Sequence, residues 1–496
     1  MRKLLLATVA VLGGSIGVAT VADAQTASPA PGTVTVRLNG RFRFYAYADS
    51  LSNLDNNASS TATGTVNSAG QGTSSGRSKL STFGFGDYAR LYPGFDGVAA
   101  NGLKYGASME IRQDNNSGAG GGVFGSISQQ SRARGGLYLR REWGYIGTDQ
   151  LGTIRLGATD GPSSLYMTGN FENFDGGGLN GDLNFFLPGN ATITWPFGDV
   201  GNMYTTNKAI YLSPQLFGFD VGVAFEPNTG NVGEDNGSGC GAGGPQGVNF
   251  VNPAGNFTPA AGANGQSVAG VGCDQLSSTS SNAESGRRRN TMDALLRYRG
   301  TFGGFGIAAT AGYIGSANVK DNQSGVGFNS DRTNGVGIRD NFAGLSVGDF
   351  GVAVTYAGFS VGGKYQYGQF NNQWSLLPRG LPEGEAWLAG FSYTAGPIVV
   401  GAHYLDYKSA GDIGNAFLGR QRRETGLAAG ATYSVAPGVS FFLSGIAEQR
   451  KQSGFNFITG QGVSAVAVNG VGGPGGNPYS NKIISRVISL GTSFTW

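Results

Sequence analysis

Apolar and polar residues alternate along most of the chain, in short segments separated by polar or glycine-rich stretches. In the first such segment, Phe42 and Phe44 fall on one face of an extended chain, whereas Arg41 and Arg43 fall on the other. A period of two residues is typical of a β-strand with two different faces. The pattern predicts sixteen strands, at about 34–48, 78–91, 103–112, 136–148, 152–159, 207–213, 219–226, 290–299, 304–315, 342–356, 359–369, 385–394, 398–407, 424–434, 439–450 and 482–496.

The connections between these segments are sorted by length. Long polar stretches follow the odd-numbered strands, and tight turns follow the even-numbered ones. We expect such turns at Pro93-Gly94, Asp149-Gln150 and Ala436-Pro437-Gly438. A soluble sandwich has no reason to sort its loops in this way, whereas an outer-membrane barrel has short periplasmic turns and long extracellular loops. The sequence therefore predicts an all-β fold, a transmembrane antiparallel β-barrel of sixteen strands, as one domain over 34–496. Its longest connections span about 160–206 and 227–289.

The last strand has an apolar face and a small polar face. Leu490, Phe494 and Trp496 share the first, and Gly491 and Ser493 share the second. This suits a barrel wall between lipid and water. The spacing also resembles the C-terminal signal of outer-membrane β-barrels, which the barrel-assembly machinery reads, with Gly491, Phe494 and Trp496 as the signal residues. The alternative is an exposed edge strand of a soluble sheet, where a terminal aromatic would favour aggregation.

The first residues have the features of an export signal. Arg2 and Lys3 precede an apolar run that ends near Val21, and Ala22-Asp23-Ala24 forms a cleavage site. We expect a cleaved signal peptide over 1–24 and a short lead over 25–33. No later stretch has the roughly 18 uninterrupted apolar residues of a membrane-spanning helix.

Export to an oxidising compartment bears on the two cysteines. Cys240 and Cys273 lie in the same polar stretch, so we predict a disulfide within one loop, with two free thiols as the alternative. A zinc site is not expected, because His403 is the only histidine and lies far along the chain.

The composition agrees with a barrel and excludes some functions. The chain has 89 Gly, 30 Phe, 20 Tyr and 5 Trp, and its mean hydropathy is only −0.14. A barrel buries alternate residues in lipid while its lumen and loops stay polar, so the hydropathy averages out. A net charge of +3 gives no sign of a nucleic-acid partner. We expect no cofactor, no metal and no enzymatic activity, because the chain offers only His403 as a histidine base.

Several segments resemble one family when their order and spacing are taken together. They are Tyr88-Ala89-Arg90-Leu91, Asn101-Gly102-Leu103-Lys104-Tyr105-Gly106, Tyr145-Ile146-Gly147 with Leu151-Gly152-Thr153-Ile154-Arg155-Leu156-Gly157, Tyr211-Leu212-Ser213-Pro214 with Gly218-Phe219, and Tyr433 through Ala436-Pro437-Gly438. Together they resemble the general diffusion porins of Gram-negative bacteria, and most of all alphaproteobacterial porins, from about 34 to 496.

The resemblance implies a homotrimer in which the segment after the fifth strand folds into the lumen and narrows it. Acidic residues of this segment would face a basic wall, so that a transverse field crosses the aqueous gap. The candidate acids are Glu172, Asp175 and Asp182, and alternation selects Arg41, Arg43, Arg90, Arg112 and Arg140 for the wall. By register from Gly147, Glu142 occupies a position where enterobacterial porins carry a wall arginine, and Arg140 shares its face.

The function that the resemblance implies is passive diffusion of small hydrophilic solutes and ions through the outer membrane. The expected partners are outer-membrane lipid, lipopolysaccharide and the barrel-assembly machinery. A substrate-specific channel for sugars or anions remains an alternative, as do an outer-membrane enzyme and a surface adhesin that uses the loop 227–289.

Two further charged sites have open interpretations. Arg287-Arg288-Arg289 is a candidate for binding lipopolysaccharide phosphates, or is a solvated charge run at a loop end. Strict alternation from Phe83 and Phe85 turns Asp87 outward, so we predict either a bulge there or a protected subunit interface.

Overall fold

The structure is a computed structural model, and it describes most of the predicted strands. The described residues are 29–51, 82–114, 137–171, 174, 178–180, 183, 186–187, 191–197, 206–228, 249–251, 257–259, 277–278, 288–321, 341–372, 374–411, 421–457, 461–462 and 480–496. The predicted signal peptide and both cysteines, Cys240 and Cys273, lie outside them, so these predictions stay predictions.

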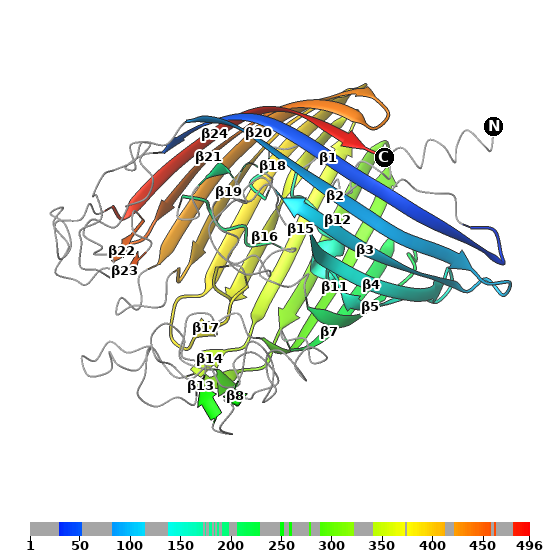
Figure 1. Ribbon diagram of the computed structural model, residues 1–496, viewed down its shortest axis with the longest axis horizontal. Coiled ribbons are helices and arrows are strands. Elements are labelled where there is room, and N and C mark those ends of the chain that lie inside the picture. Colours follow the sequence, from blue (N-terminus) through cyan, green and yellow to red (C-terminus); the bar gives the residue numbers. More distant parts are fainter. Residues whose placement is uncertain are drawn as a thin grey trace.

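Sixteen strands form one closed antiparallel barrel, as the alternation predicts (Figure 1). They are, in barrel order, β1 (Thr33–Leu51), β2 (Phe83–Val98), β3 (Lys104–Asp114), β4 (Tyr138–Thr148), β5 (Gly152–Ala158), β6 (Asn207–Leu212), β7 (Phe219–Asn228), β11 (Arg289–Phe302), β12 (Phe305–Gly315), β15 (Ser346–Tyr356), β16 (Phe359–Gln369), β18 (Gly384–Ala395), β19 (Ile398–Ser409), β20 (Arg422–Ala436), β21 (Val439–Lys451) and β24 (Lys482–Thr495). The barrel closes where β1 pairs with β24, from Arg41 opposite Thr495 to Leu51 opposite Ser485. Closure leaves no sheet edge, as a lipid environment requires.

The remaining strands are short and lie at the end of the barrel where the long connections are (Figure 1). They are β8 (Asn249–Val251), β9 (Phe257–Pro259), β10 (Ser277–Ser278), β13 (Val319–Asp321), β14 (Asn341–Ala343), β17 (Leu377–Pro378), β22 (Phe455–Asn456) and β23 (Gln461–Gly462). Among the described residues, the only helix is α2 (Pro162–Leu165), and none is long and apolar enough to cross a membrane.

The opposite end of the barrel carries the tight turns. Gly303 and Gly304 connect β11 to β12, and Ala357 and Gly358 connect β15 to β16, all four with positive φ. Two successive residues with positive φ form a turn whose twist matches that of the flanking strands. This explains why glycine occupies three of the four positions.

The turn expected at Pro93-Gly94 is wrong. Strand β2 continues to Val98, and the chain turns at 99–103, where Gly102 has a φ of +83°. Pairing of β2 with β3 runs from Leu91 opposite Ile111 to Gly94 opposite Ser108 without a shift in register. Because proline lacks an N–H group, it interrupts the hydrogen bonds locally, but it does not end the strand.

The outer face of the barrel is largely apolar, and of the two alternatives for Asp87 the bulge is absent. Pairing of β1 with β2 is continuous, with Asp87 directly opposite Phe44, and Asp87 is exposed on the outer face as strict alternation requires. Its neighbours Phe83 and Phe85 are also exposed. A carboxylate therefore lies among aromatic side chains on the outside of the wall.

The last strand has the two faces that its sequence predicts. Gly491 is buried on the inner side, whereas Phe494 and Trp496 are exposed on the outer side. The backbone of Trp496 exchanges two hydrogen bonds with Gly40 on β1, of 3.0 and 3.2 Å. This pairing closes the barrel at its C-terminal strand, and the role of these residues as an assembly signal stays a prediction.

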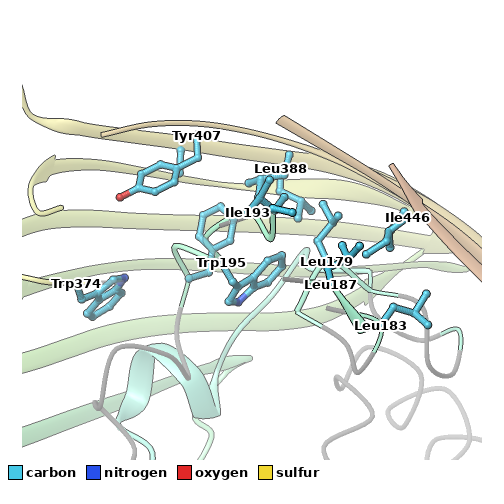
Figure 2. Packing of buried hydrophobic residues seen from close by; sticks show 14 of the residues in the cluster. Leu179, Leu183, Leu187, Ile193, Trp195, Trp374, Leu388, Tyr407 and Ile446 are labelled. Atoms are coloured by element: carbon cyan, nitrogen blue, oxygen red, sulfur yellow. The ribbon is translucent and has the colours of Figure 1, made fainter. Parts of the chain in front are cut away.

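The largest cluster of buried apolar side chains lies inside the barrel. The described residues between 162 and 197, which follow β5, pack against the inner face of strands β16 to β24 (Figure 2). Leu179, Leu183, Leu187 and Ile193 of this segment are all buried. We call the described residues from 162 to 197 the inserted segment, because its contacts are with inward-facing side chains of the wall.

Candidate functional site

The inserted segment is attached at its start to strands β7 and β11. Asp293 on β11 accepts hydrogen bonds from the backbone N–H and the hydroxyl group of Ser163, at 3.0 and 2.8 Å. The ring of Tyr166 lies 3.8 Å from the guanidinium carbon of Arg297. Burial and the nearby Asp220 carboxylate raise the pKa of Tyr166, so the ring stays neutral. The first turn of the segment is therefore held by both a carboxylate and a cation–π contact.

The middle of the inserted segment surrounds the only histidine. The backbone N–H of Leu179 donates to Nε2 of His403, at 3.2 Å, and Nδ1 lies 3.2 Å from the carbonyl oxygen of Phe171. Since Nε2 accepts a hydrogen bond, the ring proton belongs on Nδ1, which then donates to the carbonyl group. The ring centroids of Phe174 and Trp195 lie 5.8 and 6.4 Å from that of His403. His403 therefore has a structural role here.

Glycine makes room on the wall for Phe174. Gly401 on β19 lies directly opposite Gly430 on β20. A Cβ atom would come within 2.6 Å of the Phe174 ring at Gly401 and within 2.7 Å at Gly430. The two glycines form a recess that any larger residue would fill, and this fixes where the segment docks.

The returning part of the segment is held by buried carboxylates. The backbone N–H of Ile193 donates to Glu448 on β21, and that of Thr194 donates to Glu424 on β20, both at 3.2 Å. Ser485 on β24 donates to the carbonyl oxygen of Ala191 at 3.0 Å. Glu424 also contacts Arg450, and a hydrogen bond from an N–H group to such a charged carboxylate is among the stronger ones in proteins. The segment is thus fixed to β20, β21 and β24 as well as to β7 and β11.

Strands β1 to β3, which follow β24 around the closed barrel, carry a row of arginines. Arg41 on β1 lies directly opposite Arg90 on β2, and Arg90 lies directly opposite Arg112 on β3. We call these three residues the arginine row. Like charges directly opposite each other destabilise a sheet. The Tyr88 ring offsets part of this repulsion, because the guanidinium carbons of Arg41, Arg43 and Arg90 lie 5.3, 5.9 and 4.1 Å from its centroid.

A carboxylate on β3 gathers the remaining predicted wall arginines. Glu110 is buried and contacts Arg112, Arg140 at 3.2 Å and Arg141 at 2.5 Å. Arg141 also contacts Asp160, just before the inserted segment. The five arginines selected by alternation therefore lie in two groups, one around Tyr88 and one around Glu110.

Arg141 belongs to this site although alternation does not select it. Glu110 lies opposite Arg141, but the next residue, Ile111, lies opposite Leu139. Arg140 is thus the extra residue of a β-bulge, which lets neighbouring side chains reach the same face. A bulge leaves no clear signal in a pattern of apolar and polar residues.

The same bulge makes the expected lumen position of Glu142 wrong. Glu142 lies opposite Met109, which is exposed on the outer face, and is itself exposed. Beyond the bulge, the alternation of β4 is one residue out of phase with the alternation before it. Glu142 and Asp87 are therefore both acidic residues on the outer face.

Arg288 is not available to lipid phosphates. Its side chain is fully buried and contacts Glu226 at 3.5 Å and the carbonyl oxygen of Trp374 at 3.4 Å. Glu226 also lies 3.8 Å from Lys208 on the inner wall. The interpretation of Arg287-Arg288-Arg289 as an exposed lipopolysaccharide site is therefore wrong at its central residue.

The acids proposed for the tip of the segment, Glu172, Asp175 and Asp182, lie outside the described residues. Elsewhere on the inner wall, several acids contact bases, as Asp220 contacts Arg297 and Arg299 at 2.7 and 2.8 Å. In the described part of the chain, no three His, Cys, Asp or Glu residues group as metal ligands would. The arrangement is that of a closed wall with charged inner faces and an anchored internal segment.

Comparison with solved structures finds several similar chains at low sequence identity. An anion-selective porin from Comamonas acidovorans is 13% identical, with a TM-score of 0.47, over 94% of this chain and 100% of that chain. OmpF from Salmonella typhi, in complex with daunomycin, is 12% identical, with a TM-score of 0.46, over 93% and 97%. The outer-membrane protein OmpT from Vibrio cholerae, in its trimer form, is 12% identical, with a TM-score of 0.45, over 93% and 99%.

A search of curated protein sequences finds no significant match. The family model for Gram-negative porins, in contrast, matches residues 7–452, which is most of the 496 residues. The chain belongs to the Gram-negative porin family.

Proposed function

We propose that this porin is a general diffusion channel in which the inserted segment and the arginine row together set the constriction. Porin family membership supports an outer-membrane channel for passive diffusion. The observation that carries the finer proposal is the position of the inserted segment, which is anchored to Glu424, Glu448 and His403 on one side of the wall. The arginine row lies on other strands, β1 to β3.

Solutes would pass between a wall of fixed positive charge and the inserted segment. Arginine remains charged at all relevant pH values, and its planar head holds its orientation. Fixed charges that line a pore in this way make the channel prefer either anions or cations. Small hydrophilic solutes and ions would cross without a cofactor and without saturation.

The test is single-channel conductance of the purified protein in a planar bilayer, with a salt gradient across it. We expect large steps, grouped in threes, with a conductance nearly proportional to salt concentration. The reversal potential in the gradient gives the sign of ion selectivity. Folded protein that conducts no current would contradict the diffusion channel.

An anion-specific channel is the second candidate, and the arginine row favours it. Three neighbouring guanidinium groups can together hold a phosphate or carboxylate group through charge-assisted hydrogen bonds. A specific channel saturates, so its chloride current would fall when millimolar phosphate is added. A current that is unchanged by phosphate would leave the general diffusion channel as the better description.

We also propose a homotrimer whose interface includes the outer face of β2 to β4. Asp87 and Glu142 support this, because a carboxylate in the middle of a lipid-facing wall is costly, whereas a subunit interface can hydrate or pair it. Cross-linking between cysteines placed at Phe85 and at Met109, compared with cysteines at Val352 on β15, tests this interface. Cross-links only at the β15 position would contradict it.

We also propose that the chain is exported by a cleaved signal peptide and assembled through its last strand. The segment 1–24 would be removed as a signal peptide, and Gly491, Phe494 and Trp496 would direct the barrel-assembly machinery. Mass spectrometry of the mature protein should find an N-terminus at Gln25. Trp496→Ala should lower the amount of folded barrel in the outer membrane, while unchanged levels would show that assembly does not read this residue.

A further inference from the structure

A row of basic residues crosses four neighbouring strands on the outer face, at the long-loop end. Lys408 on β19 lies directly opposite Arg423 on β20, which lies opposite Lys451 on β21, which lies opposite Lys482 on β24. We call these four residues the outer basic row. Residues directly opposite each other share a face, and the inward-facing residues of these strands are the neighbours in sequence, such as Arg450 and Ile483. The row therefore points away from the lumen.

Such a row is unfavourable unless something outside it balances the charge. Like charges directly opposite each other destabilise a sheet. Two acids of the same face reduce the repulsion, since Glu385 contacts Lys408 at 2.7 Å and Asp406 contacts Arg423 at 2.5 Å. Both acids lie toward the β18 side of the row.

The β21 and β24 side of the row adds further positive charge. Lys451 is exposed, and the exposed Arg486 lies on the same outer face of β24, opposite Ala447. Glu383 and Glu385 lie on the far side, beside Tyr365 and Tyr367 of β16. Among the described residues of this face, basic residues outnumber these acids, and the excess lies on β20, β21 and β24.

The row lies at the level where the membrane ends. Lys408 is about eleven residues beyond the turn at Pro397, and a tilted strand rises roughly 25 Å over that length. This matches the height of the apolar band of outer-membrane barrels, which is about 25 Å. Trp387 and Tyr404, with ring centroids 5.3 Å apart, lie just below the row on the same face. Aromatic pairs of this kind mark the boundary between lipid and water.

We infer that the outer basic row binds the phosphate groups of an anionic lipid in the adjacent leaflet. Strand spacing places neighbouring side chains about 4.8 Å apart, so the four span roughly 15 Å. That length suits a headgroup with more than one phosphate, each held by lysine and arginine donors. The inference rests on the proposed function in one respect, which is that the long-loop end faces the outside of the cell.

The same chemistry explains why the site lies here rather than at the arginines of 287–289. Arg288 is buried against Glu226, whereas the side chain of Arg423 is 59% exposed. A lipid headgroup can approach the outer face of β19 to β24 without entering the barrel. The arginine row on the inner wall, in contrast, faces the lumen.

The test compares retention of diphosphoryl lipid A by the full-length protein and its variants. The protein is reconstituted in phosphatidylcholine vesicles with or without diphosphoryl lipid A, and bound lipid is counted by native mass spectrometry. The double variant Arg423→Gln with Lys451→Gln removes two central charges of the row. We expect its affinity for the lipid to fall at least about tenfold, since each basic residue near a lipid surface contributes several-fold.

Two matched variants separate charge from folding. Arg423→Lys with Lys451→Arg keeps the charge and should bind nearly as well as the unmodified protein. Lys104→Gln removes one positive charge at the opposite end of the barrel, where Lys104 contacts Asp149 at 2.6 Å, and should leave lipid binding unchanged. The single-channel conductance of all variants reports whether the barrel is intact.

Several results would overturn the inference. Equal binding by the double variant would show that the row does not hold the lipid, and equal loss in Lys104→Gln would show a general charge effect. Complete release of the lipid by millimolar inorganic phosphate would identify a free-anion site instead. Absence of conductance in every preparation would contradict the proposed channel, while the lipid measurement would still decide the role of the row.

Discussion

Two parts of the inner wall use the same strand geometry for opposite purposes. On β1 to β3, inward-facing positions carry arginines in direct register, namely Arg41, Arg90 and Arg112. On β18 to β24, many inward-facing positions are apolar or glycine, and the inserted segment covers them. One part of the wall therefore presents fixed charge, and the other provides a docking surface.

The difference shows what it costs to place a polypeptide segment inside a barrel. A segment in a water-filled lumen must be held against its own conformational entropy. Here it buries Phe174 and Leu179 against the wall, and its backbone N–H groups donate to Glu424 and Glu448. The arginine part of the wall is not open to water throughout, since Arg90 is buried and Phe186 of the segment stacks on Tyr47 of β1, with ring centroids 4.0 Å apart. The main docking surface of the segment is therefore the part of the lumen wall that is apolar or glycine.

Loss of the docking contact should have the largest effect. Phe174→Ala empties the recess formed by Gly401 and Gly430, and truncation of a buried phenylalanine costs about 3–5 kcal/mol. The barrel should remain closed while the segment detaches, so single-channel conductance should rise and become noisier. Gly445→Ala on β21 is the control, since its added Cβ meets only one atom, at 3.5 Å. Unchanged conductance in Phe174→Ala would mean that the segment does not limit flow.

Weakening one anchor should have an intermediate effect. Glu424→Gln keeps the shape of the side chain but removes the charge that Arg450 and the Thr194 N–H group contact. Hydrogen bonds to charged groups contribute about 1.5–3 kcal/mol. We expect more frequent current fluctuations at the same mean conductance, recorded in a planar bilayer. Glu385→Gln, on the outer face, is a matched change that should leave the current record unaltered.

Neutralising the arginine row should have the smallest energetic effect and act on selectivity alone. Arg41→Gln removes one charge of the row on a partly exposed side chain, where a charge interacts by about 1 kcal/mol with an ion 4 Å away in water. The reversal potential in a salt gradient should shift toward cation preference, with little change in protein stability. Lys104→Gln, at the short-turn end, should shift it less. A shift toward anions, or none, would exclude the arginine row from ion selection.

The strand pattern was predictable because each barrel strand has one face toward lipid and one toward water. The residues of each strand alternate accordingly, as in β24, where Ile488 and Leu490 are exposed and Val487 and Ser489 are buried. It failed where local backbone geometry departs from a period of two. Pro93 interrupts hydrogen bonds without ending β2, and the bulge at Arg140 reverses the face of Glu142.

The basic wall was only partly predictable. Alternation identifies which arginines face inward, but not which of them come together. The grouping of Arg41, Arg43 and Arg90 around Tyr88 depends on the register of β1 against β2. The role of Glu110 as the centre of a second group depends on the bulge that brings Arg141 to the same face.

The sequence by itself determined the number of strands, the sorting of short and long connections, and the inward face of most strands, because these follow from a period of two and from turn chemistry. Only the tertiary structure decided where the inserted segment docks. Its recess combines Gly401 and Gly430 with Phe174, and its anchors combine Ile193 with Glu448, residues that lie more than 200 positions apart. Such contacts depend on strand register and barrel closure, which no local pattern of residues records.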